Sequence, residues 1–350
     1  MTSSGFSSTQ PANTSFTQLR HRYFAAWPQS DSVVELKNGS VWDHSFPAEW
    51  RYSLAVLSVA EQSIQDHSLH FYLTKDANKL PEYGPHVVAV LLQEEHCRIP
   101  AYACHIRGVV RSLPSTPFPG FRSHPLNLVL AFEYLRDQMF HKRSKQLLRA
   151  AHPEWPSRLH AIPRIYTIPV GYHSHEELAP MPMRERSIDL FFPEETDAPY
   201  RFWTSETQTR RQLREVLDQL RKHPEWHIHL DKSSAGDAVA RTAHKMMNSR
   251  ICLAPRGATA ETFRLYEGLR AGCLVIANPL PEEPFLKGAP VLQVNHWNEL
   301  PDLLRKYARD LDALEHYHQA SLDWWQNHCH EKVIGPQVGL FLNGCPGGCP

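Results

Sequence analysis

The chain has 350 residues, of which 42% are hydrophobic, and its 37 basic residues (Lys and Arg) balance its 37 acidic ones (Asp and Glu). This length predicts about two domains, and the zero net charge excludes a global electrostatic attraction to nucleic acid or to an anionic membrane. No apolar run approaches the roughly 18 residues of a membrane span, and the start of the chain lacks the pattern of a signal peptide. Seven cysteines without paired spacings before the last few residues favour free thiols in a reducing compartment, so we predict a cytoplasmic globular protein.

The clearest strand of the N-terminal half is His86–Leu92, an apolar and mostly β-branched run. It leads directly into Gln93, Glu94, Glu95 and His96. Ligands of open α/β sheets bind beyond the carboxyl ends of strands, so these side chains are candidates for a catalytic base that takes a proton from an attacking hydroxyl group. We rank Glu95 first, Glu94 second and His96 third. The alternative is that the two glutamates only cap or solvate a following helix.

The segments around this strand are less regular. Residues 1–18 are rich in Ser and Thr and are predicted to form a disordered lead-in, and 29–50 shows no clear period. We predict strands over 69–73, 106–110 and 162–171, a proline-rich loop over 112–125, and helices over 52–68 and 126–151. The basic residues of 126–151 either form a solvated face or contact an anionic lipid or polysaccharide.

The C-terminal half alternates regularly between strand and helix patterns. Strands are predicted over 187–192, 226–230, 249–254, 273–277 and 291–294, and helices over 204–222, 237–248, 261–270, 298–308 and 311–331. This alternation predicts an α/β domain with a parallel sheet.

A loop between two of these strands carries the strongest candidate for a binding site. Thr259 is a plausible N-cap of the helix that follows, and the backbone N–H groups of Arg256, Gly257 and Ala258 precede it. Because a helix N-terminus attracts negative charge, this loop suits a phosphate group. Gly257 has no Cβ to obstruct the approach of a ligand.

The helix after this loop carries Arg264 and Glu267, which share one face because they are three residues apart. A guanidinium group binds an anion and a carboxylate binds hydroxyl groups, so the pair suits the phosphate and ribose of a nucleotide. The alternative is an ordinary ion pair on the surface of a crossover helix.

The string from Pro255 to Ile276, PRGATAETFRLYEGLRAGCLVI, resembles the nucleotide-sugar signature of the exostosin-like glycosyltransferases. The resemblance covers about 184–300 and is weak before that. It implies a GT-B fold, an α/β architecture of two Rossmann-like domains that face each other across a cleft. It further implies that the C-terminal domain holds the sugar nucleotide and that residues 193–195, Pro-Glu-Glu, replace a glycine that lies near the donor phosphates in the family.

From this resemblance we expect five segments. They are the lead-in 1–18, an acceptor-side Rossmann-like domain 19–178, a donor-binding Rossmann-like domain 184–310, a C-terminal helix 311–334 that packs back on the first domain, and a flexible tail 335–350.

The expected activity is transfer of a sugar from a nucleotide-diphosphate donor to a carbohydrate or lipid-linked acceptor. We expect no cofactor, no metal ion and no nucleic-acid partner. Peripheral association with a membrane is compatible with this activity. Glu261 and Glu267 are separated by five residues, whereas retaining relatives often carry two glutamates seven apart, so we favour inversion. Two alternatives stay open. The first is an epimerase or hydrolase acting on sugar nucleotides, and the second is a non-catalytic subunit that binds a sugar nucleotide or glycan.

The 22 histidines do not reveal a metal site. Pairs such as His227 and His229 lack Cys or acidic ligands at metal-binding spacing. His328, Cys329 and His330, together with Cys345 and Cys349, form the one cluster in the sequence that suits zinc, and a flexible tail is the favoured alternative. The acidic triplet 310–312 falls in a helical segment, whereas a metal-binding triplet of this kind belongs in a loop after a strand.

Overall fold

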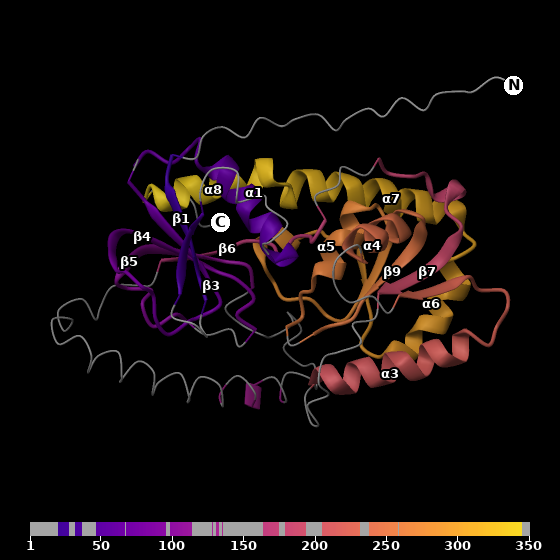
Figure 1. Cartoon of the computed structure of the whole chain (residues 1–350). Helices are drawn as coiled ribbons and strands as arrows, with labels where there is room; N and C mark the ends of the chain where they lie inside the picture. Colours follow the sequence, from indigo (N-terminus) through magenta and orange to yellow (C-terminus); the bar gives the residue numbers. More distant parts are fainter. Residues whose placement is uncertain are drawn as a thin grey trace, which may run out of the picture.

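The structure is a computed structural model that describes residues 20–27, 32–36, 47–66, 68–95, 99–113, 128, 131–132, 135, 164–174, 179–193, 205–231, 238–257 and 259–344. Within these ranges the chain forms two β-sheets with helices packed against them, placed side by side (Figure 1). The expected lead-in over 1–18 lies outside the described residues.

The N-terminal sheet has the strand order β2-β1-β3-β4-β5-β6, and its β1–β2 pairing is antiparallel while the others are parallel. Its strands are β1 (Arg22–Ala26), β2 (Val33–Leu36), β3 (His70–Thr74), β4 (Gly84–Leu91), β5 (Ile106–Arg111) and β6 (Ile165–Thr167). The predicted strand over 86–92 is confirmed, and the last five residues of β4 are buried, as expected for a strand inside a parallel sheet. The parallel strands follow chain order across the sheet, so this half contains no reversal of strand order.

The C-terminal sheet is parallel throughout and has the order β11-β10-β9-β7-β8. Its strands are β7 (Ile188–Pro193), β8 (Ile228–Asp231), β9 (Ser249–Ala254), β10 (Leu274–Ala277) and β11 (Val291–Gln293), and its helices are α3 (Ser205–Leu220), α4 (Ala238–Met247), α5 (Phe263–Arg270) and α6 (Leu300–Tyr307). The strand order reverses between β7 and β9. Doubly wound sheets of this order bind ligands at the carboxyl ends of the strands next to such a reversal.

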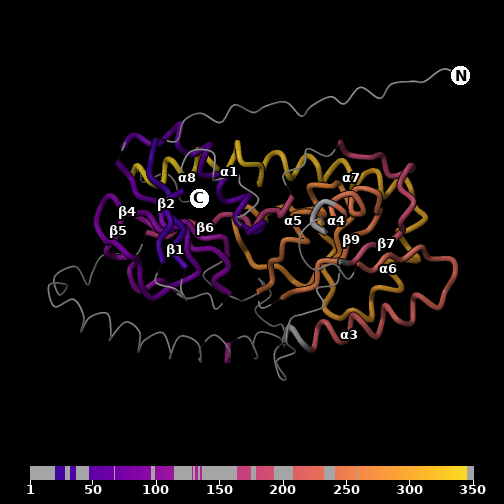
Figure 2. The backbone as a smooth tube through the Cα atoms, viewed as in Figure 1, coloured from indigo at the N-terminus to yellow at the C-terminus, as the bar shows by residue number. Residues whose placement is uncertain are grey.

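The last helices connect the two halves. In Figures 1 and 2, α7 (Leu311–Trp324) lies over the C-terminal half, and α8 (Glu331–Leu342) lies beside α1 (Arg51–Ala60) in the N-terminal half. Between them the residues Trp325–Cys329 form a π-helical turn. The hydroxyl group of Tyr52 in α1 donates a hydrogen bond of 2.5 Å to the Cys329 carbonyl oxygen, which ties this turn to the N-terminal domain.

The prediction of a flexible tail from residue 335 onward is wrong over 335–342, because these residues belong to α8. Gly335 and Gly339 lie one helical turn apart, and a Cβ atom built at Gly335 would come within 2.6 Å of Val59 in α1. The glycines therefore allow two helix backbones to pack closely, and they do not mark a flexible segment.

Buried apolar side chains form layers on both faces of each sheet. One continuous cluster includes Val90 of β4, Val275 of β10 and Trp325 of the π-helical turn, so it spans both halves. Separate clusters cover the opposite face of the N-terminal sheet and the opposite face of the C-terminal sheet. The two α/β domains, whose strands are parallel except for the β1–β2 pair, and the C-terminal helices that return to the first domain agree with the GT-B fold that the resemblance implies. None of the described helices is long and apolar enough to cross a membrane.

Candidate active site

The predicted phosphate loop follows β9, next to the point where strand order reverses. The backbone N–H of Arg256 donates to Asn278 Oδ1 at 3.0 Å, and that of Gly257 donates to the Thr259 carbonyl oxygen at 3.0 Å. The Arg256 side chain is buried. Both amides are thus used inside the protein, so the loop in this conformation does not present them to an anion. Ala258 lies outside the described residues.

The prediction that Thr259 caps the next helix is wrong. Helix α5 begins at Phe263, its N-cap residue is Thr262, and the Thr262 side chain makes no capping hydrogen bond. Thr259 is buried, and its hydroxyl group donates to the Glu261 carbonyl oxygen at 2.9 Å. This side chain thus bonds to the backbone ahead of the helix and does not cap it.

Arg264 and Glu267 form the ion pair that their spacing predicts, with 2.7 Å between Nη1 and Oε2. Their side chains are only 19% and 12% exposed, so the pair differs from an ordinary surface ion pair. The other carboxylate oxygen of Glu267 accepts a hydrogen bond of 3.0 Å from the backbone N–H of His173. Burial raises the pKa of Glu267, but Arg264 and His173 lower it more strongly, to about 2, so the group is ionised at neutral pH.

His173 belongs to the segment that enters the C-terminal domain from the N-terminal one. Its imidazole ring lies 3.9 Å from the ring of Phe263, measured between centroids, and its backbone carbonyl accepts a hydrogen bond from Arg51 of α1. The first turn of α5 therefore contacts the connecting segment, which is itself hydrogen-bonded to α1 of the N-terminal domain. No pattern in the sequence marks His173 as part of this site.

The predicted base residues occupy two different environments. The Glu94 side chain is 1% exposed and pairs with Arg111 of β5, with 3.8 Å between Oε2 and Nη2. Glu95 is exposed, and His96 lies outside the described residues. Gln93, directly before them, has a positive φ of 52°, which is uncommon for a residue other than glycine. After β4, Glu94 is buried and Glu95, the next residue, is exposed.

Three charged residues, one of which is the partner of Glu94, were not predicted as site residues: Arg111, Glu261 and Glu283. Arg111 ends β5 in the N-terminal sheet, whereas Glu261 and Glu283 follow β9 and β10 in the C-terminal sheet. Burial raises the pKa of both glutamates, and the positive charge of Arg111 partly opposes this, so charged groups of the two domains interact electrostatically here. The arginine that ends β5 directly after the apolar pair Val109–Val110 is the signal in the sequence that could have identified Arg111.

Glu261 is the most deeply buried carboxyl group of this cluster. It accepts a short hydrogen bond from the hydroxyl group of Tyr266, and its Oε1 atom has no hydrogen-bond partner among the described residues. Burial and the nearby Glu283 raise its pKa from 4.5 to about 8, against the opposing effects of Tyr266 and Arg111. Glu261 is therefore largely protonated at neutral pH.

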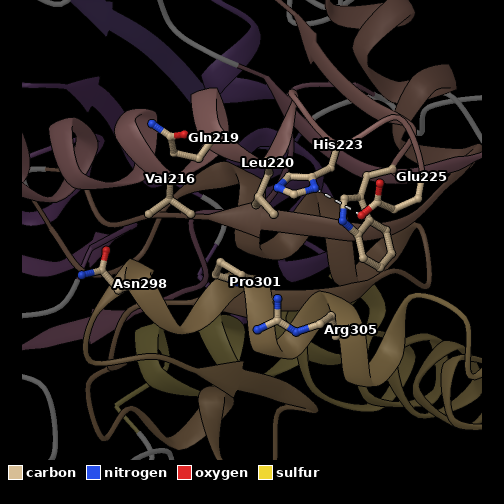
Figure 3. A pocket seen from close by; sticks show the side chains of 9 residues that line it. Val216, Gln219, Leu220, His223, Glu225, Asn298, Pro301 and Arg305 are labelled. Carbon is tan, nitrogen blue, oxygen red and sulfur yellow. Dashed lines mark ion pairs between the residues drawn. The ribbon is translucent and has the colours of Figure 1, made fainter.

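A pocket of about 330 Å³ lies elsewhere, between α3 and α6 (Figure 3). Its lining includes the His223–Glu225 ion pair, with 3.4 Å between the charged atoms, and the side chains of Trp226 and Arg305. All of its lining residues come from the helical face of the C-terminal domain. It contains none of the residues described above, so it is a separate feature of the surface.

The zinc ligands considered in the sequence analysis are only partly described. Cys329 is buried, which raises the pKa of its thiol, and the His330 imidazole accepts a hydrogen bond of 3.1 Å from the Lys332 backbone as the cap of α8. Cys345 and Cys349 lie outside the described residues.

No protein-family model matches this sequence, and no curated protein is similar to it in sequence. Among solved structures, the chain is similar to a variant of S. aureus TarM in complex with fondaparinux, α-GlcNAc-glycerol and UDP, with 10% identity, a TM-score of 0.44, and coverage of 83% of this chain and 58% of that one. It is also similar to TarM in another crystal structure, with 11% identity, a TM-score of 0.42 and the same coverages. The GtfA/B complex shows 12% identity, a TM-score of 0.37, and coverage of 75% and 58%. The chain thus spans less than two thirds of the length of each of these proteins.

Proposed function

We propose that this protein is a glycosyltransferase that transfers a sugar from a nucleotide-diphosphate donor to a carbohydrate or lipid-linked acceptor. The observation that supports this best is the electrostatic interaction between charged groups that follow strands of both sheets. Glu94 and Arg111 come from the N-terminal domain, and Glu261 and Glu283 come from the C-terminal domain. A transferase needs such a meeting point because its donor and acceptor approach from different domains.

On the donor side we assign the nucleotide to α5 and the loop before it. Arg264 is the cation best placed to neutralise the leaving diphosphate, since it is partly exposed whereas Arg256 is buried. Glu267 is ionised and would accept hydrogen bonds from the ribose hydroxyl groups. Gly257 and Thr259 would approach the phosphates only if the loop rearranged, because the Gly257 amide and the Thr259 hydroxyl donate inside it.

On the acceptor side we assign the catalytic base to Glu95. An exposed carboxylate can take the proton of an acceptor hydroxyl as its oxygen bonds to the anomeric carbon and the bond to the diphosphate breaks. This direct displacement inverts the anomeric carbon and needs no metal ion. Glu94 is buried against Arg111, so it positions that guanidinium group and is unsuited to accept the proton. His96 is the alternative base.

The donor site can be tested by measuring the melting temperature with a panel of nucleoside diphosphates, because a ligand that binds the folded state raises it. At saturating concentrations we expect at least one diphosphate to raise the melting temperature by several degrees. Arg264→Ala and Glu267→Ala should each abolish this rise. The absence of any shift in the wild-type protein would contradict the proposal.

The chain offers a matched control for these variants. Arg305 and Asp302 also form an ion pair three residues apart on a helix of the same domain, but their side chains are 67% and 78% exposed. Asp302→Ala should leave the nucleotide response unchanged. Equal responses of Asp302→Ala and Glu267→Ala would show that the Arg264 pair has only a structural role. Product formed from the donor alone would instead favour an epimerase or a hydrolase.

A further inference from the structure

Two histidines and a glutamate lie close together at the amino ends of strands β3 and β4 in the N-terminal sheet. His70 is the first residue of β3, His86 is the third residue of β4, and Glu82 lies just before β4. Glu82 Oε2 is 2.9 Å from His70 Nδ1, and Glu82 Oε1 is 2.6 Å from His86 Nε2. The two imidazole rings meet edge to face, with 5.1 Å between their centroids. One carboxylate thus joins two strands through their histidines.

The three side chains have the chemistry and spacing of a zinc site. Each offers one ligand atom, and these atoms lie within 4.8 Å of one another. A tetrahedral zinc ion with bonds of about 2.0–2.1 Å separates its ligand atoms by about 3.3 Å. The two histidine–carboxylate separations are less than 1 Å shorter than this, and the three ligand atoms lie within 4.8 Å, so small shifts of the side chains would place them around one ion.

The surroundings of the cluster also suit a metal ion. The side chains of His70, Glu82 and His86 are 21%, 37% and 38% exposed, so an ion has access and a water molecule can complete the coordination. The Tyr72 hydroxyl group donates a hydrogen bond of 2.9 Å to Glu82 Oε2 and thereby orients the carboxylate. The guanidinium group of the neighbouring Arg22 is neutralised by Glu35, at 2.8 and 3.1 Å.

We propose that His70, Glu82 and His86 bind one zinc ion per chain. The ligands come from the amino ends of β3 and β4, whereas the candidate active site lies at the carboxyl ends of the strands. This zinc site is therefore independent of the proposed glycosyl transfer. Its effect would be to fix the link between the two strands by replacing two hydrogen bonds with coordinate bonds.

Zinc binding to the chelator-treated full-length protein can be measured by competition with a chromophoric chelator and by isothermal titration calorimetry. We expect saturation at one zinc ion per chain and a rise in the melting temperature. His86→Ala should weaken binding at least about 10–100-fold, since the loss of a ligand costs no less than the loss of its hydrogen-bonding partner. Glu82→Gln, which keeps the size of the side chain, should weaken it similarly.

The control is His223→Ala, which removes a histidine from an exposed His–Glu pair with 3.4 Å between the charged atoms. It should bind zinc as the wild-type protein does. Circular dichroism of each variant checks that it folds. Wild-type protein without saturable zinc binding, or undiminished binding in both His86→Ala and Glu82→Gln, would overturn the proposal, because the ion would then be absent or bound elsewhere.

Discussion

Replacing Glu261 with glutamine tests whether the carboxyl group between the two domains is held neutral. Burial, aided by Glu283, raises its pKa from 4.5 to about 8, against the effects of Tyr266 and Arg111. In the unfolded chain the group ionises near its ordinary pKa, so between pH 4.5 and 8 the folded protein retains a proton that the unfolded chain releases. The wild-type protein should therefore lose stability as the pH rises through this interval.

The size of the effect follows from the shift. One pKa unit corresponds to about 1.4 kcal/mol, so a shift from 4.5 to about 8 destabilises the folded state by roughly 5 kcal/mol above pH 8 and by little at pH 5. Glutamine has nearly the same shape, still offers Tyr266 an acceptor and does not ionise. A change of 1 kcal/mol in unfolding free energy shifts the melting temperature of a domain of 150–250 residues by about 2–4 °C. If Glu261→Gln recovers half of the roughly 5 kcal/mol, its melting temperature at pH 8.5 should exceed that of the wild type by about 5–10 °C.

Thermal melts of both proteins from pH 5 to pH 9, followed by circular dichroism, measure this difference. The gain of Glu261→Gln should grow with pH and level off above pH 8. Glu282→Gln, a change at an exposed glutamate nearby, should show no such trend. A variant that is no more stable than the wild type at pH 8.5, or a difference that does not depend on pH, would refute the assignment of a neutral buried carboxyl group.

Three further changes test buried contacts, two between α1 and the C-terminal helices and one within the C-terminal half. Gly335→Ala should destabilise the protein by about 1–3 kcal/mol in urea denaturation, because the new Cβ would meet Val59 at 2.6 Å. Tyr52→Phe should cost about 1–3 kcal/mol in the same assay, because it removes the buried hydrogen bond to the Cys329 carbonyl. Arg186→Met should cost more than Tyr52→Phe, because this buried guanidinium donates to three backbone carbonyls, and an equal cost would contradict that role.

The C-terminal domain could be predicted well because its signals are local. The strand over 249–254 is confirmed as β9, and the helix predicted from 261 is α5, which begins two residues later. Each of these elements shows its own period and is bounded by proline or glycine. The N-terminal domain lacks such signals, since β2 lies at the sheet edge with three exposed residues and shows no alternation of buried and exposed positions.

Helix α8 and the group of Arg111, Glu261 and Glu283 were not predicted, for a different reason. Glycine and proline end most helices, but here Gly335 and Gly339 provide close contact with α1, and that role depends on a partner helix almost 300 residues away in the sequence. Likewise, Arg111 and Glu261 belong to different domains, so their proximity has no local signature. Contacts of this kind follow from the arrangement of the sheets, which a single sequence does not show.

The histidine cluster shows how strand polarity separates two kinds of site in one sheet. Parallel strands usually require a long connection with a helix between them. Residues 75–83 join β3 to β4 without a helix. Glu82, near the end of this connection, lies at the amino ends of both strands. The polar side chains at these strand ends form their hydrogen bonds with one another, as the contacts of Glu82 with His70 and His86 show. At the carboxyl ends of the strands, Glu94 follows β4 and pairs with Arg111, the last residue of β5. The contacts at the amino ends of β3 and β4 therefore link these two strands. The carboxyl ends of β4 and β5 are available for the proposed chemistry between the domains.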